Sequence, residues 1–250
     1  MPLDRIALVT GANKGVGKQV ASELVANGLT VIVGSRDLTR GREAAADIGG
    51  GATALQLDVT DARSIATAAA WIRERFGRLD VLVNNAGISH TQADFTMDDY
   101  AAMSRASTAS IEGVRAIWDV NVFGTLAVYQ AMLPLLRESS DARIVNVSSG
   151  LGSLTETSDP NYPYRSTFGP GYPASKTALN AMALAMSIEL EGTPIKVNVV
   201  SPAFTATALN DFQGTESVED GSREVVRVAL LGADGPTGTF TLWNGEVIPW

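Results

Sequence analysis

Short apolar runs alternate with longer stretches in which apolar residues recur every three or four positions along this chain of 250 residues. A run of about six apolar residues suits a strand that is buried on both faces of a parallel sheet, and the longer period suits an amphipathic helix. Together they predict an α/β protein with a doubly wound, seven-stranded parallel sheet and helices on both faces. The predicted strands are residues 5–10, 30–35, 53–58, 79–83, 143–149, 195–200 and 238–243.

The helical period is longest between residues 111 and 136, where Pro134 is expected to end or kink the helix. Residues 150–171 are rich in Gly, Ser, Thr, Pro and Tyr and are expected to form a loop without an element of its own, and residues 204–216 a lid. We expect one domain over residues 1–250, with both segments at the substrate. Other helices are predicted after Gly17, at about 61–76, around 97–103, from Pro173 onward and at 217–231.

The composition excludes several kinds of catalytic site. The chain has no Cys, which rules out disulfides, thiol nucleophiles and Cys-ligated zinc, and His90 is its only imidazole. A metal site and a Ser-His-Asp hydrolase are therefore not expected, and acid-base chemistry has to come from Tyr, Lys, Asp or Glu. His90 itself is interpreted as a loop residue at the rim of a pocket.

Charge and hydropathy also limit the partners. The net charge of −8 argues against a nucleic-acid or anionic-membrane surface. No stretch approaches about 18 consecutive apolar residues, and residues 1–5 show no signal-peptide pattern. We therefore expect a soluble, cytoplasmic protein.

Gly11, Gly15 and Gly17 stand between the first predicted strand and the first helix. Glycines let the backbone turn sharply and approach a phosphate, and a helix N-terminus adds unpaired N–H groups and its dipole. The spacing differs from the commonest dinucleotide fingerprint, Gly-x-Gly-x-x-Gly. A P-loop is excluded, because Ala12 stands where Gly is needed and Gln19 where Ser or Thr is needed. The alternative is a plain glycine turn.

Arg36 follows the second predicted strand, where a dinucleotide fold presents a side chain to the adenosine ribose. Together with Lys14 and Arg40 it suits a 2′-phosphate, which favours NADP(H). Asp37 disagrees with this interpretation, since an acidic side chain would accept hydrogen bonds from a free 2′-hydroxyl. Asp37 and Arg40 could instead be solvated charges at the start of a helix.

Tyr172 and Lys176 are four residues apart at the start of a predicted helix, so both can reach one small volume. A phenol has a pKa of about 10, and a nearby cation lowers it toward the range of a general acid or base. Asn121 lies inside the apolar stripe of the long helix, either as a satisfied core amide or as part of a working polar network.

Taken together, these signals resemble the short-chain dehydrogenase/reductase family over essentially the whole chain, which implies a Rossmann fold. The stretches 13–17, 36–41 and 230–250 are similar to NADPH-dependent carbonyl reductases. The resemblance rests on motifs in the family's order, which are Thr10 to Gly17, Asp58, Asn84-Asn85-Ala86-Gly87, Asn121, Ser149, Tyr172 and Lys176.

The resemblance implies a role for each of four catalytic residues. Tyr172 would donate a proton to the substrate carbonyl oxygen, and Ser149 would hydrogen-bond that oxygen. Lys176 would lower the pKa of Tyr172 and bind the nicotinamide ribose, and Asn121 would hold a water that relays protons to Lys176. The implied cofactor-binding residues are Gly11, Asn13, Lys14, Gly15, Val16, Gly17, Arg36, Asp58, Val59, Asn85, Ala86, Gly87, Tyr172, Lys176, Pro202, Thr205 and Thr207.

Two departures from the family pattern stand out. Ala203 follows Pro202 where the family usually has Gly, and the separation of Ser149 from Tyr172 is longer than in the shorter members, as in the carbonyl-reductase branch. The resemblance implies a monomer or a homo-oligomer acting on a small molecule. The expected activity is NADPH-dependent reduction of a ketone or aldehyde. The alternatives are oxidation of a secondary alcohol and a non-catalytic NADP(H)-binding sensor.

Overall fold

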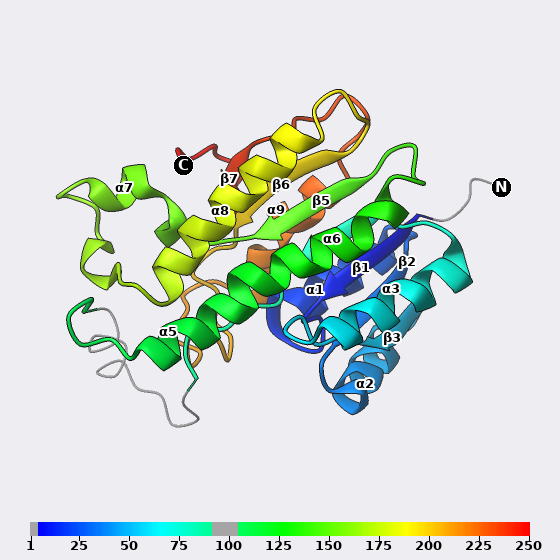
Figure 1. The fold of residues 1–250 in the computed structure, drawn as a ribbon, viewed down its shortest axis with the longest axis horizontal. Helices are drawn as coiled ribbons and strands as arrows, with labels where there is room; N and C mark the ends of the chain where they lie inside the picture. Colours follow the sequence, from blue (N-terminus) through cyan, green and yellow to red (C-terminus); the bar gives the residue numbers. More distant parts are fainter. Residues whose placement is uncertain (1–4, 92–104) are drawn as a thin grey trace.

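A computed structural model describes the protein at residues 5–91 and 105–250. Its centre is one seven-stranded sheet in the order β3-β2-β1-β4-β5-β6-β7, with every neighbouring pair parallel, which confirms the predicted fold (Figure 1). The chain winds outward to β3 and then returns to place β4 beside β1. In open α/β sheets, such a switch of direction creates a ligand-binding crevice at the carboxyl ends of the two strands. The strands are β1 (Ile6–Thr10), β2 (Thr30–Ser35), β3 (Ala52–Gln56), β4 (Val81–Asn84), β5 (Arg143–Val147), β6 (Lys196–Ser201) and β7 (Phe240–Leu242).

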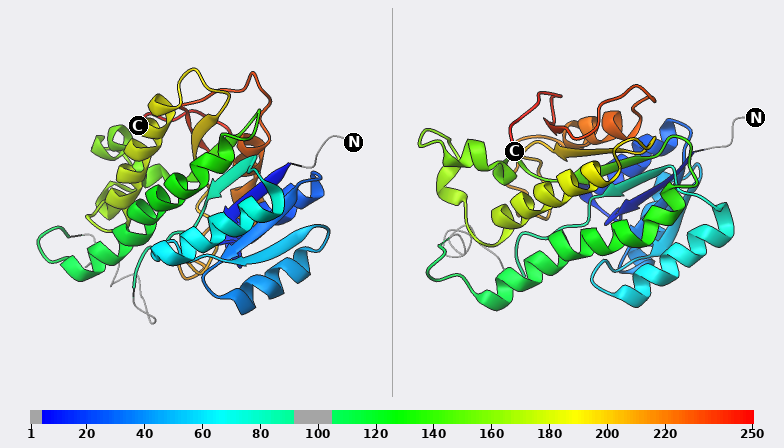
Figure 2. Two further views of the ribbon diagram at one scale, coloured as in Figure 1. Left: turned by 45° about the vertical axis from the view of Figure 1, so that its right-hand side comes forward. Right: turned by 45° about the horizontal axis from the view of Figure 1, so that its top comes forward.

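Helices cover both faces of the sheet (Figures 1 and 2). Successive residues of a strand point to opposite faces, so Leu8 joins one core cluster while Ala7 and Val9 join the other. This two-sided burial explains why the strands are continuous apolar runs. One face carries α1 (Gly15–Ala26), α2 (Leu38–Ile48) and α9 (Val218–Ala229), and the other carries α3 (Ala62–Phe76), α5 (Ile111–Trp118), α6 (Thr125–Leu136) and α8 (Tyr172–Glu189).

β3 and β5 each end two residues before the predicted residue, because a polar side chain starts a turn there. β3 ends at Gln56, and the Asp58 carboxylate accepts hydrogen bonds from the backbone N–H and the hydroxyl of Thr60. β5 ends at Val147, and Ser149 Oγ accepts from the N–H of Leu151. Such local bonds compete with the sheet ladder. Both Asp58 and Ser149 therefore lie just beyond a strand and not within it.

The long helix at residues 111–136 passes from α5 through a π-helical segment, η1 (Asp119–Gly124), into α6. Pro134 was expected to end or kink this helix, and α6 ends two residues after it, at Leu136. A proline this close to the end removes one backbone bond, while the buried Leu135 and Leu136 keep the last turn packed. By length and composition this helix could cross a membrane, but half of its most apolar window is buried in the protein, as expected for a core helix.

Residues 150–171 are not a featureless loop, contrary to the prediction. They contain two 3₁₀ turns, η2 (Gly150–Gly152) and η3 (Arg165–Thr167), and the short helix α7 (Leu154–Ser158). Ser153 caps α7, because its Oγ accepts a hydrogen bond from the N–H of Glu156. Elements of this length depend on caps and leave no apolar period in the sequence. The predicted helix around 97–103 lies outside the described residues.

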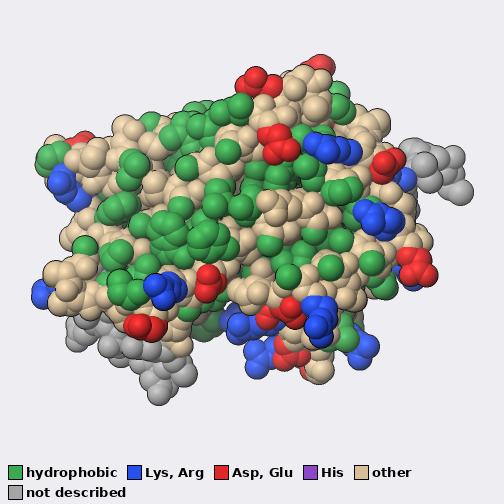
Figure 3. Space-filling view, viewed as in Figure 1, with side chains coloured by type: hydrophobic (Ala, Val, Ile, Leu, Met, Phe, Trp, Pro, Cys, Tyr) green, Lys and Arg blue, Asp and Glu red, His purple; other side chains and the backbone are tan. Residues whose placement is uncertain are grey.

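The face formed by α5, η1, α6 and α8 exposes apolar side chains. Figure 3 views the molecule from this side and shows hydrophobic side chains gathered across its middle. Phe123 and Ile188 are 55% and 57% exposed. Exposed apolar area of this kind often marks a contact surface.

Candidate active site

Tyr172 is the first residue of α8 and is half-buried. The next residue, Pro173, suits this position, because its fixed φ is helical and an N–H is not needed there. The hydroxyl of Ser175 donates to the backbone carbonyl of Tyr172 at 2.6 Å, which supports the first turn. The sequence thus fixes Tyr172 at the end of α8 that meets the carboxyl edge of the sheet.

Lys176 lies one turn further along α8 and is only 4% exposed. Its Nζ donates to the carbonyl of Val147 at 2.9 Å and lies 5.6 Å from the centre of the Tyr172 ring. Burial lowers the pKa of the Lys176 ammonium to about 8. Among the described residues no carboxylate lies within ion-pair distance of it. The protein therefore holds the buried Lys176 ammonium beside the Tyr172 ring.

Asn121 is fully buried within η1, and its amide is well satisfied. Its Nδ2 donates to the Ile88 carbonyl and to Ser175 Oγ, and its Oδ1 accepts from the Ile88 N–H, each at 2.9 Å. It is thus a satisfied core amide that also joins a polar network reaching α8. One lone pair of Oδ1 remains for a further donor.

Gly87 separates Asn121 from Lys176. A side-chain carbon at this glycine would lie 3.3 Å from Asn121 Oδ1 and 3.5 Å from Lys176 Nζ. Because Gly87 has no side chain, the polar ends of both residues border the same small space. The two predicted catalytic residues on different helices are thus brought together.

Ser149 lies at the carboxyl edge, directly after β5 and at the start of η2. The N–H of the next residue, Gly150, donates to Ser201 Oγ at 2.8 Å, which joins the ends of β5 and β6. Lys176 also reaches the end of β5 through its bond to Val147. These contacts hold the Ser149 turn near the start of α8.

The glycine loop adopts the backbone that phosphate binding requires. Gly11 and Gly15 have φ of 64° and 55°, in the left-handed region that favours glycine. Lys14, the N-cap residue of α1, makes no side-chain cap, so the first N–H groups of α1 are left for a ligand. A plain glycine turn would not require uncapped N–H groups at the start of α1. The arrangement therefore favours an anion-binding loop over a plain turn.

The ends of β1 and β4 are locked together beside this loop. Thr10 Oγ1 accepts from the N–H groups of Asn85 and Ala86 at 3.0 Å, and Asn85 Nδ2 donates to the Thr10 carbonyl at 2.9 Å. A Cβ at Gly17 would collide with Asn85 Nδ2, at 2.3 Å. The glycine loop and Asn85 therefore pack against each other at the carboxyl ends of β1 and β4.

Asp37 is explained by the helix that follows it. Its carboxylate accepts from the N–H groups of Thr39 and Arg40 and forms an ion pair with the Arg40 side chain at 3.5 Å. Arg36 and Lys14 are exposed, and within the described chain neither lies within ion-pair distance of a carboxylate. Asp37 and Arg40 are thus helix-start charges, while Arg36 and Lys14 stay available to an anion.

The segment 204–216 reaches the glycine loop. A Cβ at Gly15 would lie 3.4 Å from the Thr207 methyl group. Ser89 Oγ donates to the Leu209 carbonyl at 2.5 Å, and a bridge between Thr205 and Glu216 closes the segment on itself. Thr205 and Thr207 therefore lie on a segment that borders the glycine loop, and Pro202 precedes them directly after β6.

Asp58 and Val59 lie beyond β3, at the same edge. The Asp58 N–H donates to Ser64 Oγ at 3.0 Å, which fixes the turn into α3. Val59 packs so closely on Gly124 that a Cβ there would lie 2.9 Å from its side chain. This contact joins the turn after β3 to η1.

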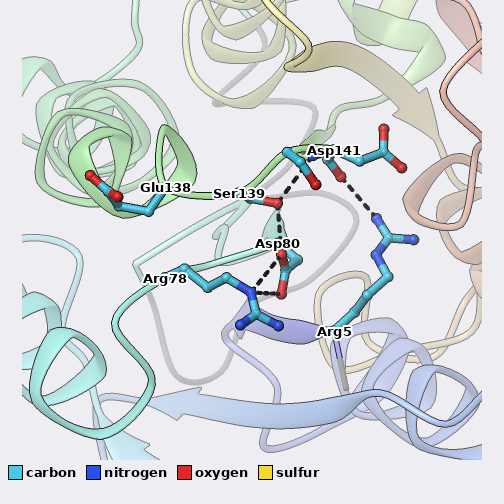
Figure 4. A pocket seen from close by; sticks show the side chains of 7 residues that line it. Arg5, Arg78, Asp80, Glu138, Ser139 and Asp141 are labelled. Carbon is cyan, nitrogen blue, oxygen red and sulfur yellow. Dashed lines mark hydrogen bonds and ion pairs between the residues drawn. The ribbon is translucent and has the colours of Figure 1, made fainter. Parts of the chain in front are cut away.

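A separate hollow of about 380 Å³ lies at the opposite, amino edge of the sheet (Figure 4). Asp80 accepts there from the Ile6 N–H at 2.8 Å, from Arg78 Nε at 3.1 Å and from Ser139 Oγ at 2.6 Å. Arg5 donates to the Asp141 carbonyl. These bonds join the starts of β1, β4 and β5, and no predicted site residue lies among them.

Sequence reasoning missed the polar residues that support the site, notably Ser175 and Ser201. Ser175 stands between Tyr172 and Lys176, so helical spacing placed it close by but gave no sign of its bond to Asn121. Ser201 ends an apolar run, and only the observed pairing of β5 with β6 brings it to Gly150. Neither residue belongs to a motif whose spacing would have predicted these contacts.

Known proteins resemble this chain along nearly its full length. A family model described as short chain dehydrogenase matches residues 5–217. The short-chain dehydrogenase anuI of Penicillium roqueforti is 35% identical over 237 residues, which cover 91% of this chain and 89% of that protein. The structure of salutaridine reductase from Papaver somniferum has a TM-score of 0.80 and 28% identity, covering 94% and 99% of the two chains. NADPH-bound carbonyl reductase from chicken fatty liver has a TM-score of 0.80 and 27% identity, covering 99% of both.

Proposed function

Because this chain belongs to the short-chain dehydrogenase/reductase family, we propose that it is an NADPH-dependent reductase that converts a ketone or an aldehyde to the alcohol. The observation that carries the proposal is the buried Lys176 ammonium, 5.6 Å from the Tyr172 ring, with Ser149 on the neighbouring strand end. This arrangement supplies a proton donor, a cation that stabilises its anion and a hydrogen-bond donor.

Tyr172 donates its hydroxyl proton to the carbonyl oxygen of the substrate, and Ser149 donates a hydrogen bond to the same oxygen. Preorganised donors about 3 Å from such an oxygen stabilise the negative charge that develops on it. When bound, NADPH supplies the hydride to the carbonyl carbon. Lys176 favours the phenolate that Tyr172 becomes, because an adjacent cation lowers the pKa of a phenol.

Proton return to Tyr172 uses the space beside Gly87. A water there accepts a hydrogen bond from Lys176 Nζ and donates one to the remaining lone pair of Asn121 Oδ1. The 3.3 Å and 3.5 Å approaches of these atoms to the Gly87 side-chain position support this role. After the Lys176 ammonium gives a proton to the Tyr172 phenolate, the water that Asn121 orients gives a proton to the Lys176 amine and takes one from solvent.

The crevice fits a dinucleotide with a 2′-phosphate. The left-handed glycines and the open N-terminus of α1 suit the pyrophosphate, and Lys14 and Arg36 suit the 2′-phosphate. The residues assigned to the rest of the cofactor are Gly11, Asn13, Gly15, Val16, Gly17, Asp58, Val59, Asn85, Ala86, Gly87, Tyr172, Lys176, Pro202, Thr205 and Thr207.

The substrate is an uncharged, largely apolar small molecule. The segments 88–110, 150–171 and 203–216 contain only His90, Arg105 and Arg165 as basic residues, and Arg165 already donates to the Ser158 carbonyl. Phe204, Leu209 and Phe212 on the lid are exposed. These segments therefore supply few cations to bind a carboxylate or phosphate and several apolar side chains to bind an apolar group. We place the protein in the cytoplasm, as a monomer or a homo-oligomer.

A panel of uncharged ketones and aldehydes, followed by NADPH absorbance, tests the proposal. Wild type should oxidise NADPH with at least one carbonyl. Tyr172→Phe should lower kcat/KM by about 10²–10⁴-fold while NADPH still binds, because only the proton donor is lost. Binding of NADPH without turnover on any carbonyl would favour the sensor alternative, and an unchanged rate in Tyr172→Phe would reject Tyr172 as the donor.

A further inference from the structure

We infer that Asn180, acting with Ser148, is a positioning residue that holds Ser149 against α8 so that Ser149 and Tyr172 meet one carbonyl oxygen. This role rests on the function proposed above. Neither residue belongs to the motifs from which the catalytic groups were predicted. Both are nearly fully buried, at 3% and 2% exposure.

The side-chain amide of Asn180 forms hydrogen bonds on both sides of the Ser149 turn. Asn180 lies on α8, one turn beyond Lys176. Its Oδ1 accepts from Ser148 Oγ at 2.6 Å, and its Nδ2 donates to the Gly152 carbonyl at 3.1 Å. The residue before Ser149 and the third residue after it are thus bound to the same side chain.

The turn is also pressed directly onto the backbone of α8. A Cβ at Gly152 would lie 3.0 Å from the carbonyl carbon of Lys176 and 3.0 Å from Asn180 Nδ2. Ser148 Oγ lies 3.5 Å from the Lys176 carbonyl oxygen. By contrast, the Ser149 hydroxyl accepts from Leu151 within its own turn. Asn180 is therefore the side chain of α8 that binds this turn on both sides of Ser149, while Lys176 binds the end of β5 before it.

This attachment matters because the two donors come from different elements. Tyr172 begins α8, whereas Ser149 follows β5, and both must lie within hydrogen-bond distance of one atom. A misplacement of about 1 Å in such a site can cost about 10²-fold in rate. One helix then carries the proton donor, the cation and the anchor of the second donor.

A double-mutant cycle tests the role. Asn180→Ala should lower kcat/KM about 10- to 100-fold in the wild-type background. In the Ser149→Ala background, where no donor is left to position, the same change should cost about twofold or less, since effects of residues that act as a unit are not additive. Equal losses in both backgrounds would show a general structural effect and overturn the inference, as would no loss in the wild type.

Matched variants guard against loss of folding. Ser148→Ala removes only one of the two bonds and should give a smaller loss, and Ser148→Thr, which keeps the hydroxyl, should restore activity. Ser187→Ala, a buried hydroxyl near the far end of α8, should leave kcat/KM unchanged. NADPH affinity, measured by fluorescence, should stay within about twofold in all of them, because the hydrogen bonds of Asn180 go to Ser148 and Gly152 and not to the glycine loop at residues 11–17.

The outcomes separate the two proposals. If wild type turns over no carbonyl, the proposed function fails and this role fails with it. If wild type is active and the Ser148 and Asn180 variants match it, only the positioning role is rejected.

Discussion

The Lys176 ammonium lies one helical turn from Tyr172, 5.6 Å from the centre of its ring, and is buried. Burial brings its pKa down from 10.5 to about 8. A lysine on the surface would stay charged throughout the range in which enzymes are assayed, whereas this one changes charge within that range. Both the activity and the stability of the protein should therefore depend on pH near 8.

The reductive rate should fall as pH rises above about 8. The ammonium, which we propose favours phenolate and passes protons, is then replaced by a neutral amine. The pH profile of kcat at saturating NADPH measures this loss. Lys176→Arg, whose guanidinium does not titrate in this range, should be less active but should lose the alkaline fall near pH 8. A wild-type rate that stays level to pH 9.5 or so would contradict the assignment.

The stability of the free protein should change in the opposite direction. The folded pKa of Lys176 lies below the unfolded value, so the unfolded chain binds more protons between pH 8 and 10.5, and this contribution to the unfolding free energy rises with pH across that window. Lys176→Met should remove the rise and stabilise the protein at pH 7 by up to about 3 kcal/mol. Urea unfolding of both proteins at pH 7 and pH 9.5 or so tests this. Equal pH slopes would contradict it.

Arg36→Ala should weaken NADPH far more than NADH. A charge-assisted bond to a phosphate is worth about 1.5–3 kcal/mol, or about 10- to 100-fold in Kd. Arg40→Ala is the matched control, since Arg40 is also exposed but already paired with Asp37. Fluorescence titration with both cofactors measures the ratio. Equal weakening of NADPH and NADH by Arg36→Ala would argue against a 2′-phosphate site.

Asp80→Ala should reduce stability without changing kcat. It leaves the Ile6 N–H, Arg78 and Ser139 without their common acceptor and should cost about 3 kcal/mol, as for other buried charged groups. Asp47→Ala, which removes an exposed ion pair with Lys18, should cost less than about 1 kcal/mol. Urea unfolding gives the free energies. If folded Asp80→Ala lost activity, the amino edge of the sheet would influence the chemistry at the carboxyl edge, and the prediction would be wrong.

The repeating apolar runs predicted all seven strands to within two residues, and the long helix at 111–136, because burial on both faces leaves a direct pattern in the sequence. The pairing of Tyr172 with Lys176 was equally predictable, since helical spacing sets it. Contacts between distant segments left no such pattern. Nothing near Asn121 in the sequence points to Ile88, and nothing near Ser149 points to Asn180.

Local chemistry also escaped the apolar pattern. The caps that build α7 involve single serines, and the π-helical segment around Asn121 has the same apolar spacing as an ordinary helix. Asp37 differs from these cases. The sequence left two alternatives for it, a ribose contact and a charge at the start of a helix, and the geometry makes it a helix cap.

The polar cluster around Asp80 has a practical consequence for protein engineering. It joins the strands at the amino edge of the sheet, while the proposed chemistry takes place at the carboxyl edge. Added stability at the first edge could therefore offset the destabilisation that new sequences in 150–171 and 204–216 would bring. The segments proposed to contact the substrate could then be exchanged while the polar cluster around Asp80 stays unchanged.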